Sequence, residues 1–92
     1  MRLLFRFTIP VEKGNECASD GTLMLALKVL VEETKPEAAY FHLDNGCRAG
    51  TLVFEADDAE KMAAINEPFF AKVNACIDIQ PVLALDELLK SV

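Results

Sequence analysis

The sequence is poor in the residues from which the common catalytic and nucleotide-binding motifs are built. Its 92 residues include no tryptophan, one tyrosine, one histidine and four glycines. Gly14 and Gly21 fit neither of the glycine-rich nucleotide fingerprints, so nucleotide binding is not supported. Ser19 and Ser91 have no histidine and aspartate placed to complete a catalytic triad, which argues against a hydrolase.

Cysteine is scarce, and its positions follow no metal-site pattern. The three cysteines are odd in number and have no Cys-x-x-Cys or Cys/His spacing: Cys17, Cys47 and Cys76. We therefore expect free thiols in a reducing, cytoplasmic compartment. The acidic residues between positions 55 and 60 are explained by helix capping, so neither a metal nor a cofactor is expected.

The chain also lacks long apolar runs and an excess of basic residues. Residues 23–31 are interrupted by Lys28 and are far fewer than the ~20 residues of a membrane-spanning helix. Arg6 interrupts the first apolar run and no cleavage site follows it, which argues against a signal peptide. The 9 basic and 15 acidic residues give a net charge of −6, so nucleic acid and anionic membranes are not expected partners.

The sequence does have enough apolar residues to fold. They make up 52% of the chain against 26% charged residues, the composition of a packed domain. So short a chain has room for one hydrophobic core, and residues 1–92 are expected to form a single domain. The gain from a core this small nearly equals the entropy cost of folding, so a subunit interface is a natural source of further stability.

Hydrophobic alternation and turn residues predict the first three strands. Residues 2–9 show the period-two alternation of a half-buried strand, which Pro10 ends. Residues 38–44 and 47–55 flank Asn45-Gly46, the strongest short signal for a two-residue hairpin turn. That turn fixes the opposed pairs as Asp44 with Cys47, His42 with Ala49, Phe41 with Gly50 and Tyr40 with Thr51.

A helix is predicted between the first strand and the hairpin. Residues 11–15 are expected to form a loop, with Asn15 as a candidate helix cap. Apolar residues at helical spacing then continue until Lys35-Pro36. Because Gly21 weakens the first half, the regular helix is expected to begin near Thr22.

A second helix and a last strand follow the hairpin. The capping sequence Asp57-Asp58-Ala59-Glu60 opens a helix through Val73. Pro68 is expected to kink or restart this helix, because proline has no amide hydrogen to donate. Residues 76–80 alternate as a strand, and residues 86–90 are expected to form one or two helical turns.

The element order β-α-β-β-α-β predicts the ferredoxin-like split βαβ fold, an α+β architecture. Right-handed crossovers place both helices on one face of a four-stranded antiparallel sheet. The residues that alternate toward the helices are nearly all apolar, which supports this fold. They are Leu3, Phe5, Phe7, Ile9, Ala39, Phe41, Leu43, Gly50, Leu52, Phe54, Ile77 and Ile79.

The opposite face of the sheet carries polar and apolar residues together. Leu4, Tyr40 and Val53 make it too apolar to be left fully in water. An open sheet face of this kind commonly pairs with a copy of itself under two-fold symmetry. We therefore expect a homodimer that forms through the helix-free sheet face.

Three stretches resemble known proteins: residues 9–15 (IPVEKGN), 35–41 (KPEAAYF) and 67–70 (EPFF). With the element order and face pattern of residues 1–90, they resemble the dimeric α+β barrel superfamily, and within it a small, functionally uncharacterised bacterial family. The resemblance implies two ferredoxin-like sheets packed face to face, with the helices outside. Its members include small monooxygenases, muconolactone isomerase-like enzymes, haem-handling enzymes, stress-response proteins and ligand-binding modules, so it implies no single activity.

The candidate catalytic residues lie on the helix-free face: His42, Tyr40 and Arg6. His42 could serve as a general base, although a lone histidine on an edge strand is more often a hydrogen-bonded interface residue. A haem-ligand role is disfavoured, because nothing marks a propionate clamp. Arg6 should lie opposite Asp78, where an internal salt bridge is favoured over binding of a carboxylate or enolate ligand.

The phenylalanines are predicted to meet in one layer between helices and sheet, mainly as core: Phe5, Phe7, Phe41, Phe54, Phe69 and Phe70. The alternative is a ligand-binding role for all of these except Phe54. A small apolar molecule would then enter where Pro68 breaks the helix, beside the loop of residues 11–15. Arg2 and Arg48, at the ends of the sheet, are expected to be solvated.

Two functions remain open. The favoured one is a homodimer that binds a partner or a small apolar molecule without catalysis. The alternative is a cofactor-independent monooxygenase or isomerase that acts on a small apolar organic substrate through His42, Tyr40 and Arg6. The two differ in whether these side chains converge around a cavity on the order of a few hundred Å³ or are closed off by the partner subunit.

Overall fold

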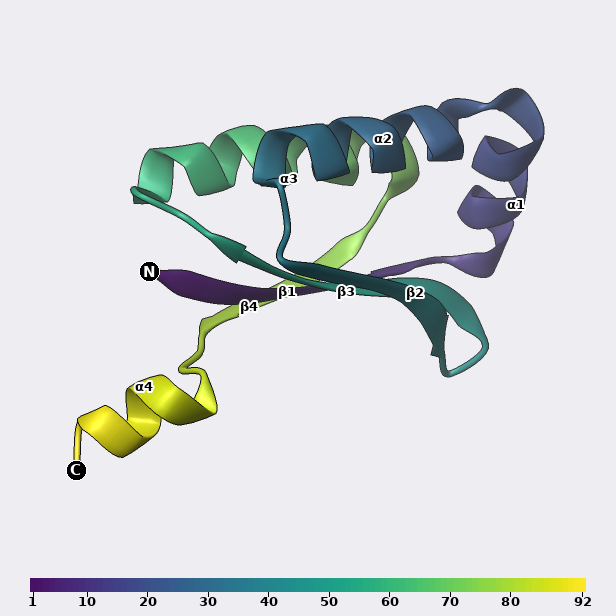
Figure 1. The fold of residues 1–92 in the computed structure, drawn as a ribbon. Helices are drawn as coiled ribbons and strands as arrows, with labels where there is room; N and C mark the ends of the chain where they lie inside the picture. Colours follow the sequence, from purple (N-terminus) through teal and green to yellow (C-terminus); the bar gives the residue numbers. More distant parts are fainter.

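The computed structural model describes residues 1–92, except for the side chain of residue 59. Three helices cover one face of a single antiparallel sheet with the strand order β2-β3-β1-β4, and α4 stands on the other side of the sheet (Figure 1). This arrangement confirms the predicted ferredoxin-like α+β fold. The elements are β1 (Arg2–Ile9), α1 (Val11–Asp20), α2 (Thr22–Thr34), β2 (Ala38–Asp44), β3 (Cys47–Glu55), α3 (Ala59–Val73), β4 (Cys76–Pro81) and α4 (Leu85–Lys90).

The central strand β1 carries the middle of the core. Its alternate residues Leu3, Phe5, Phe7 and Ile9 face the helices, and none is more than 6% exposed. The ring of Phe7 meets that of Phe69 on α3 edge-on, with centroids 4.9 Å apart. This favourable aromatic geometry joins the sheet to the helix layer.

The hairpin between β2 and β3 has the predicted turn and register. Asn45 and Gly46 have φ angles of 50° and 78°, the two left-handed residues of a type I′ turn. All four predicted pairs are confirmed: Asp44 with Cys47, His42 with Ala49, Phe41 with Gly50 and Tyr40 with Thr51.

The predicted loop at residues 11–15 is wrong, because α1 begins at Val11 directly after Pro10. Asn15 therefore lies inside a helix and does not cap a later one. The glycine that suggested a loop has a different role. A Cβ at Gly14 would lie 2.8 Å from a guanidinium nitrogen of Arg48, so glycine here lets the Arg48 side chain lie against the helix.

Gly21 separates α1 from α2 and explains why the second helix begins at Thr22, as predicted. Its φ of 85° is left-handed, which ends the first helix without the steric penalty that a side chain would impose. The Asp20 carboxylate accepts a hydrogen bond of 2.8 Å from the Thr22 amide. Hydrogen bonding by Thr22, through its side chain first and its amide second, holds the pKa of Asp20 below its ordinary value.

The third helix starts within the predicted capping sequence, with Asp58 as its N-cap. The Asp58 carboxylate accepts a hydrogen bond of 2.8 Å from the Lys61 amide, and the helix runs to Val73. It does not restart at Pro68, which lies inside it as part of one continuous element. Pro68 is exposed, so water can solvate the carbonyl group that its missing N–H leaves unpaired. None of the helices, in the part of the chain described, is long and apolar enough to cross a membrane.

The edge strand β2 is not covered by the helices. Phe41 and Leu43 point to the helix side as predicted, yet they are 53% and 72% exposed. Phe70 on α3 is also 41% exposed. The prediction of a single layer of six phenylalanines is therefore wrong for Phe41 and Phe70, and the buried layer consists of Phe5, Phe7, Phe54 and Phe69.

We expect Gly50→Ala to destabilise the protein by about 2–3 kcal/mol, because the new methyl group would overlap the buried Phe7 ring and crowd Phe41. Urea unfolding measures this loss. The matched control is Gly21→Ala, where nothing lies within 4 Å and only the left-handed φ is penalised, at a cost of about 1 kcal/mol. Equal stability of the Gly50→Ala variant and the wild type would contradict this account of the Phe7 contact.

Candidate functional site

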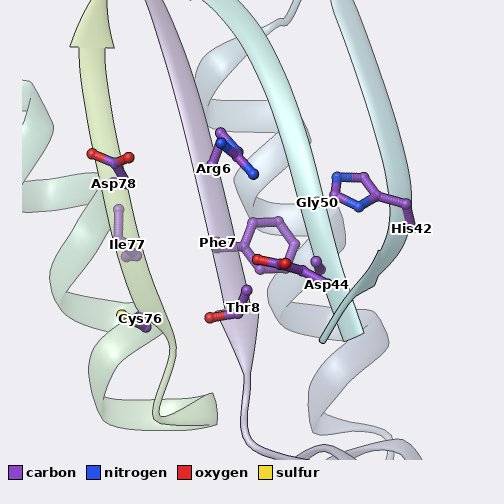
Figure 2. Close-up of a pocket in the computed structure, with 10 residues that line it drawn as sticks. Arg6, Phe7, Thr8, His42, Asp44, Gly50, Cys76, Ile77 and Asp78 are labelled. Carbon is purple, nitrogen blue, oxygen red and sulfur yellow. The ribbon is translucent and has the colours of Figure 1, made fainter. Parts of the chain in front are cut away.

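A hollow of about 190 Å³ lies on the helix-free face of the sheet. We call it the polar hollow, because several polar side chains from β1, β2 and β4 line it (Figure 2). Phe7 and Gly50, which are opposite each other in the β1–β3 register, belong to its lining. The lining residues are Arg6, Phe7, Thr8, His42, Asp44, Ala49, Gly50, Cys76, Ile77 and Asp78.

His42 reaches from the edge strand over the neighbouring strand β3. Its Nε2 lies 2.8 Å from the Thr51 hydroxyl oxygen, and its Nδ1 lies 3.1 Å from the Leu43 carbonyl oxygen. A carbonyl can only accept, so in the neutral ring Nδ1 donates and Nε2 accepts the Thr51 hydroxyl proton. The nitrogen that a general base would need is therefore already engaged.

Arg6 and Asp78 are opposite each other in the β1–β4 register, as predicted. The expected salt bridge is nonetheless not formed, since the ion pairs of the described side chains do not include Arg6. Figure 2 shows why: the guanidinium extends toward β3, whereas the Asp78 carboxylate lies over β4. Arg6 is exposed, and its charge remains available to a ligand or to a second protein surface.

Tyr40 faces the same side of the sheet two residues before His42, but it does not line the polar hollow. Its side chain is 69% exposed. The polar hollow thus brings together Arg6 and His42, two of the three candidate catalytic residues. It leaves the third on the open surface beside them.

A second opening lies on the helix side, between α2 and the uncovered strand β2. We call this opening of about 360 Å³ the apolar cleft. Phe7 and Phe41 belong to its lining, whereas Phe5 and Phe69 are buried in the core and Phe70 faces outward. The lining consists of Phe7, Ile9, Leu23, Leu27, Phe41, His42, Leu43, Arg48 and Ala49.

The ligand entrance expected beside Pro68 is too small for an organic molecule. The space between α2 and α3 there measures about 40 Å³, far below the volume of a pocket for a small organic ligand. Because α1 replaces the expected loop, no loop borders it at residues 11–15 either. A larger apolar space lies at the other end of α2, against β2.

Over residues 3–92 the chain matches the family described as "Domain of unknown function (DUF3303)". The chain belongs to the DUF3303 family. No curated protein matches it. Two solved structures resemble it. The de novo designed protein Ferredog-Diesel has a TM-score of 0.51 and 12% identity, and the match covers 88% of this chain and 85% of that one. The periplasmic divalent cation tolerance protein CutA from Archaeoglobus fulgidus has a TM-score of 0.50 and 19% identity, and the match covers 98% of this chain and 93% of that one. At these identities the likeness concerns the ferredoxin-like fold alone.

Two arginines of this DUF3303 chain have partners that sequence reasoning missed. Arg48 donates a hydrogen bond of 3.0 Å to the Asn15 side chain. Arg2 forms ion pairs with Glu37, at 2.6 Å, and with Glu87, and its hydrogen bond to Glu37 raises the pKa of Arg2. The prediction that both arginines are solvated is wrong, and no local pattern could have found partners so distant along the chain.

The three cysteines are free, but they differ in environment: Cys17 is buried, Cys47 is half-buried and Cys76 is exposed. The Cys17 thiol lies 3.5 Å from the Lys72 carbonyl oxygen. Within the described side chains, no group of three or more histidine, cysteine, aspartate or glutamate residues is placed to hold a metal ion.

Proposed function

We propose that this protein is a homodimer of the dimeric α+β barrel type and that each copy binds a small apolar molecule without catalysis. The apolar cleft of about 360 Å³ between α2 and β2 is the observation that carries the binding proposal. Its volume suits a small organic ligand. A cytoplasmic location is consistent with three free cysteines.

The dimer is supported by the uneven covering of the sheet. Helices α1, α2 and α3 lie over one face only (Figure 1). On the other face Leu4 and Val53 are only partly buried, and Tyr40 is 69% exposed. Packing two such faces together would remove these side chains from water, and each would meet the same surface on its partner.

The chemistry of the apolar cleft points to the class of ligand. Leu23, Leu27 and Phe41 supply its walls, and the polar side chains in its lining are His42 and Arg48. Such a lining favours a mainly hydrocarbon or aromatic body. Bound there, the ligand would cover the exposed ring of Phe41 and gain the free energy of burying it.

Light scattering at micromolar concentration should give twice the chain mass of 10.1 kDa. We expect Val53→Arg to give a monomer, because it would place a charge without a partner in the middle of the packed faces. The matched control is Met24→Arg, at an exposed apolar position on α2, which should remain dimeric.

Either of two results would contradict this dimer. A wild-type chain that is monomeric and has a native spectrum would rule out the dimer. Dissociation by Met24→Arg, with Val53→Arg still dimeric, would move the interface to the outer surface of α2.

Naphthalene is a suitable probe of the apolar cleft, because it has an aromatic body and no polar group. We expect it to shift the amide resonances of Leu27 and Phe41 in a titration followed by NMR. Phe41→Ser should weaken its binding about five-fold, through loss of the ring that lines the cleft. Phe70→Ser, which removes a similarly exposed ring on α3, is the control and should leave the affinity unchanged. Equal affinities of the two variants would contradict ligand binding in the apolar cleft.

The alternative function, a cofactor-independent monooxygenase or isomerase, is favoured by one observation. Arg6 and His42 share the polar hollow of about 190 Å³, where an arginine could hold an anionic substrate group beside a proton acceptor. It is the weaker proposal, because the Thr51 hydroxyl occupies Nε2 of His42 and Tyr40 lies outside the hollow.

His42→Ala separates the two functions. If His42 is an interface residue, the substitution should weaken dimerisation by about 1–2 kcal/mol, through lost hydrogen bonds and packing. If it is a general base, the dimer should be unchanged and turnover of the true substrate should fall about 10²- to 10⁴-fold. We expect the first result in sedimentation equilibrium. Thr8→Ala, in the same hollow, serves as the control.

A further inference from the structure

Arg48 brings a permanent positive charge to the lining of the apolar cleft. On β3 it lies opposite Ile9 of β1 and Leu43 of β2. Both of these residues face the helix side, so the Arg48 side chain also leaves the sheet toward the helices. It is half-buried there. The cleft therefore has a cation at the border of a mainly apolar surface.

The guanidinium of Arg48 is held in place but is not neutralised. It lies close against α1, because a Cβ at Gly14 would be only 2.8 Å from one of its nitrogens. That nitrogen donates a hydrogen bond of 3.0 Å to the Asn15 side chain. The ion pairs of the described side chains do not include Arg48. An arginine has five N–H donors, so the hydrogen bond to Asn15 leaves donors for an anion.

The acidic residues near Arg48 in the sequence are directed elsewhere. Asp44 lines the polar hollow on the other face of the sheet. On α1, Glu12 and Glu16 are each two residues from Gly14 and are exposed. With 3.6 residues in a helical turn, they lie on the opposite side of α1 from Gly14. An anionic group beside Arg48 would therefore not have to displace a carboxylate of the protein.

Away from Arg48, the apolar cleft continues over the outer surface of α2. Leu27 and Phe41 belong both to the cleft and to a neighbouring groove of about 870 Å³. The groove is lined mainly by apolar side chains, among them the exposed Met24 and Leu25. A ligand with one charged end and one hydrocarbon end would match this change from cation to apolar surface.

We infer that the ligand of the apolar cleft is a small carboxylic acid with a hydrocarbon or aromatic body, and that its carboxylate binds Arg48. This inference rests on the binding function proposed above and adds the polar group by which the ligand is recognised. A guanidinium can hold a carboxylate through two parallel hydrogen bonds. The single charge of a carboxylate also matches the single arginine better than the larger charge of a phosphate does.

The carboxylate also gives the half-buried guanidinium a partner. A charge that is partly removed from water without a partner costs free energy. A carboxylate bound beside Leu23 and Leu27 would lower this cost for Arg48, while the body of the ligand packs against Phe41. The hydrogen bond from Arg48 to Asn15 would keep the guanidinium oriented before the ligand arrives.

The test compares 2-naphthoate with 2-naphthamide in calorimetric titrations of the full chain. The two probes share the aromatic body of naphthalene and have nearly the same shape, but only 2-naphthoate is an anion at neutral pH. We expect 2-naphthoate to bind about 10-fold more tightly, because its hydrogen bonds with Arg48 are charge-assisted on both sides.

Arg48→Gln should remove this preference. It should weaken the binding of 2-naphthoate about 10-fold and leave the affinities for 2-naphthamide and naphthalene unchanged, which shows that the cleft remains folded. The matched control is Lys90→Gln, which removes the same unit of charge from α4 and should leave the preference for 2-naphthoate intact. Asn15→Ala, at an exposed helical position, should weaken 2-naphthoate about three-fold, because Arg48 loses the group that orients it.

The outcomes that overturn the carboxylate differ from those that overturn the site. If naphthalene binds but 2-naphthoate is bound no more tightly than 2-naphthamide, the inference is wrong and the proposed apolar site stands. If none of the three probes binds, both are wrong. Equal losses of all three probes in Arg48→Gln would make Arg48 a structural residue of the cleft. Loss of 2-naphthoate in Arg6→Gln, without loss in Arg48→Gln, would place the carboxylate in the polar hollow and reject the inference.

Discussion

The two left-handed residues of the hairpin turn constrain everything that the sheet presents on its surfaces. Asn45 and Gly46 set the register of β2 against β3. A shift of one residue would exchange the two faces of the strand. The turn therefore determines that His42 meets Thr51 on the helix-free face, and that Phe41 lies over Gly50 on the helix side.

The second constraint is the limited width of the helix layer. The buried residues of α2 and α3 contact the core at β1 and β3, and the edge strand β2 extends beyond them. The uncovered part of β2 forms a wall of the apolar cleft. The opposite face has no such layer, so the same strand borders the polar hollow there. Both candidate sites therefore arise from incomplete covering of one hairpin.

The strands, the hairpin register and the two faces could be predicted from the sequence, because alternation and turn chemistry are local properties. The helix at Val11 could not, since Gly14 is a loop signal until the Arg48 side chain that lies against it is known. The ion pairs of Arg2 join residues far apart in the chain. The exposure of Phe41 could not be predicted from the sequence either. Periodicity gives the direction of a side chain, but it does not show how far a helix extends sideways over a sheet.

Phe41 and His42 are consecutive residues of the same edge strand, and they line openings on opposite faces. A movement of β2 that admitted a ligand beside Phe41 would therefore also displace His42 at the surface proposed to meet the second copy. Ligand occupancy and subunit association would then be thermodynamically linked. By reciprocity, the factor by which association changes the affinity for ligand equals the factor by which the ligand changes the affinity between subunits.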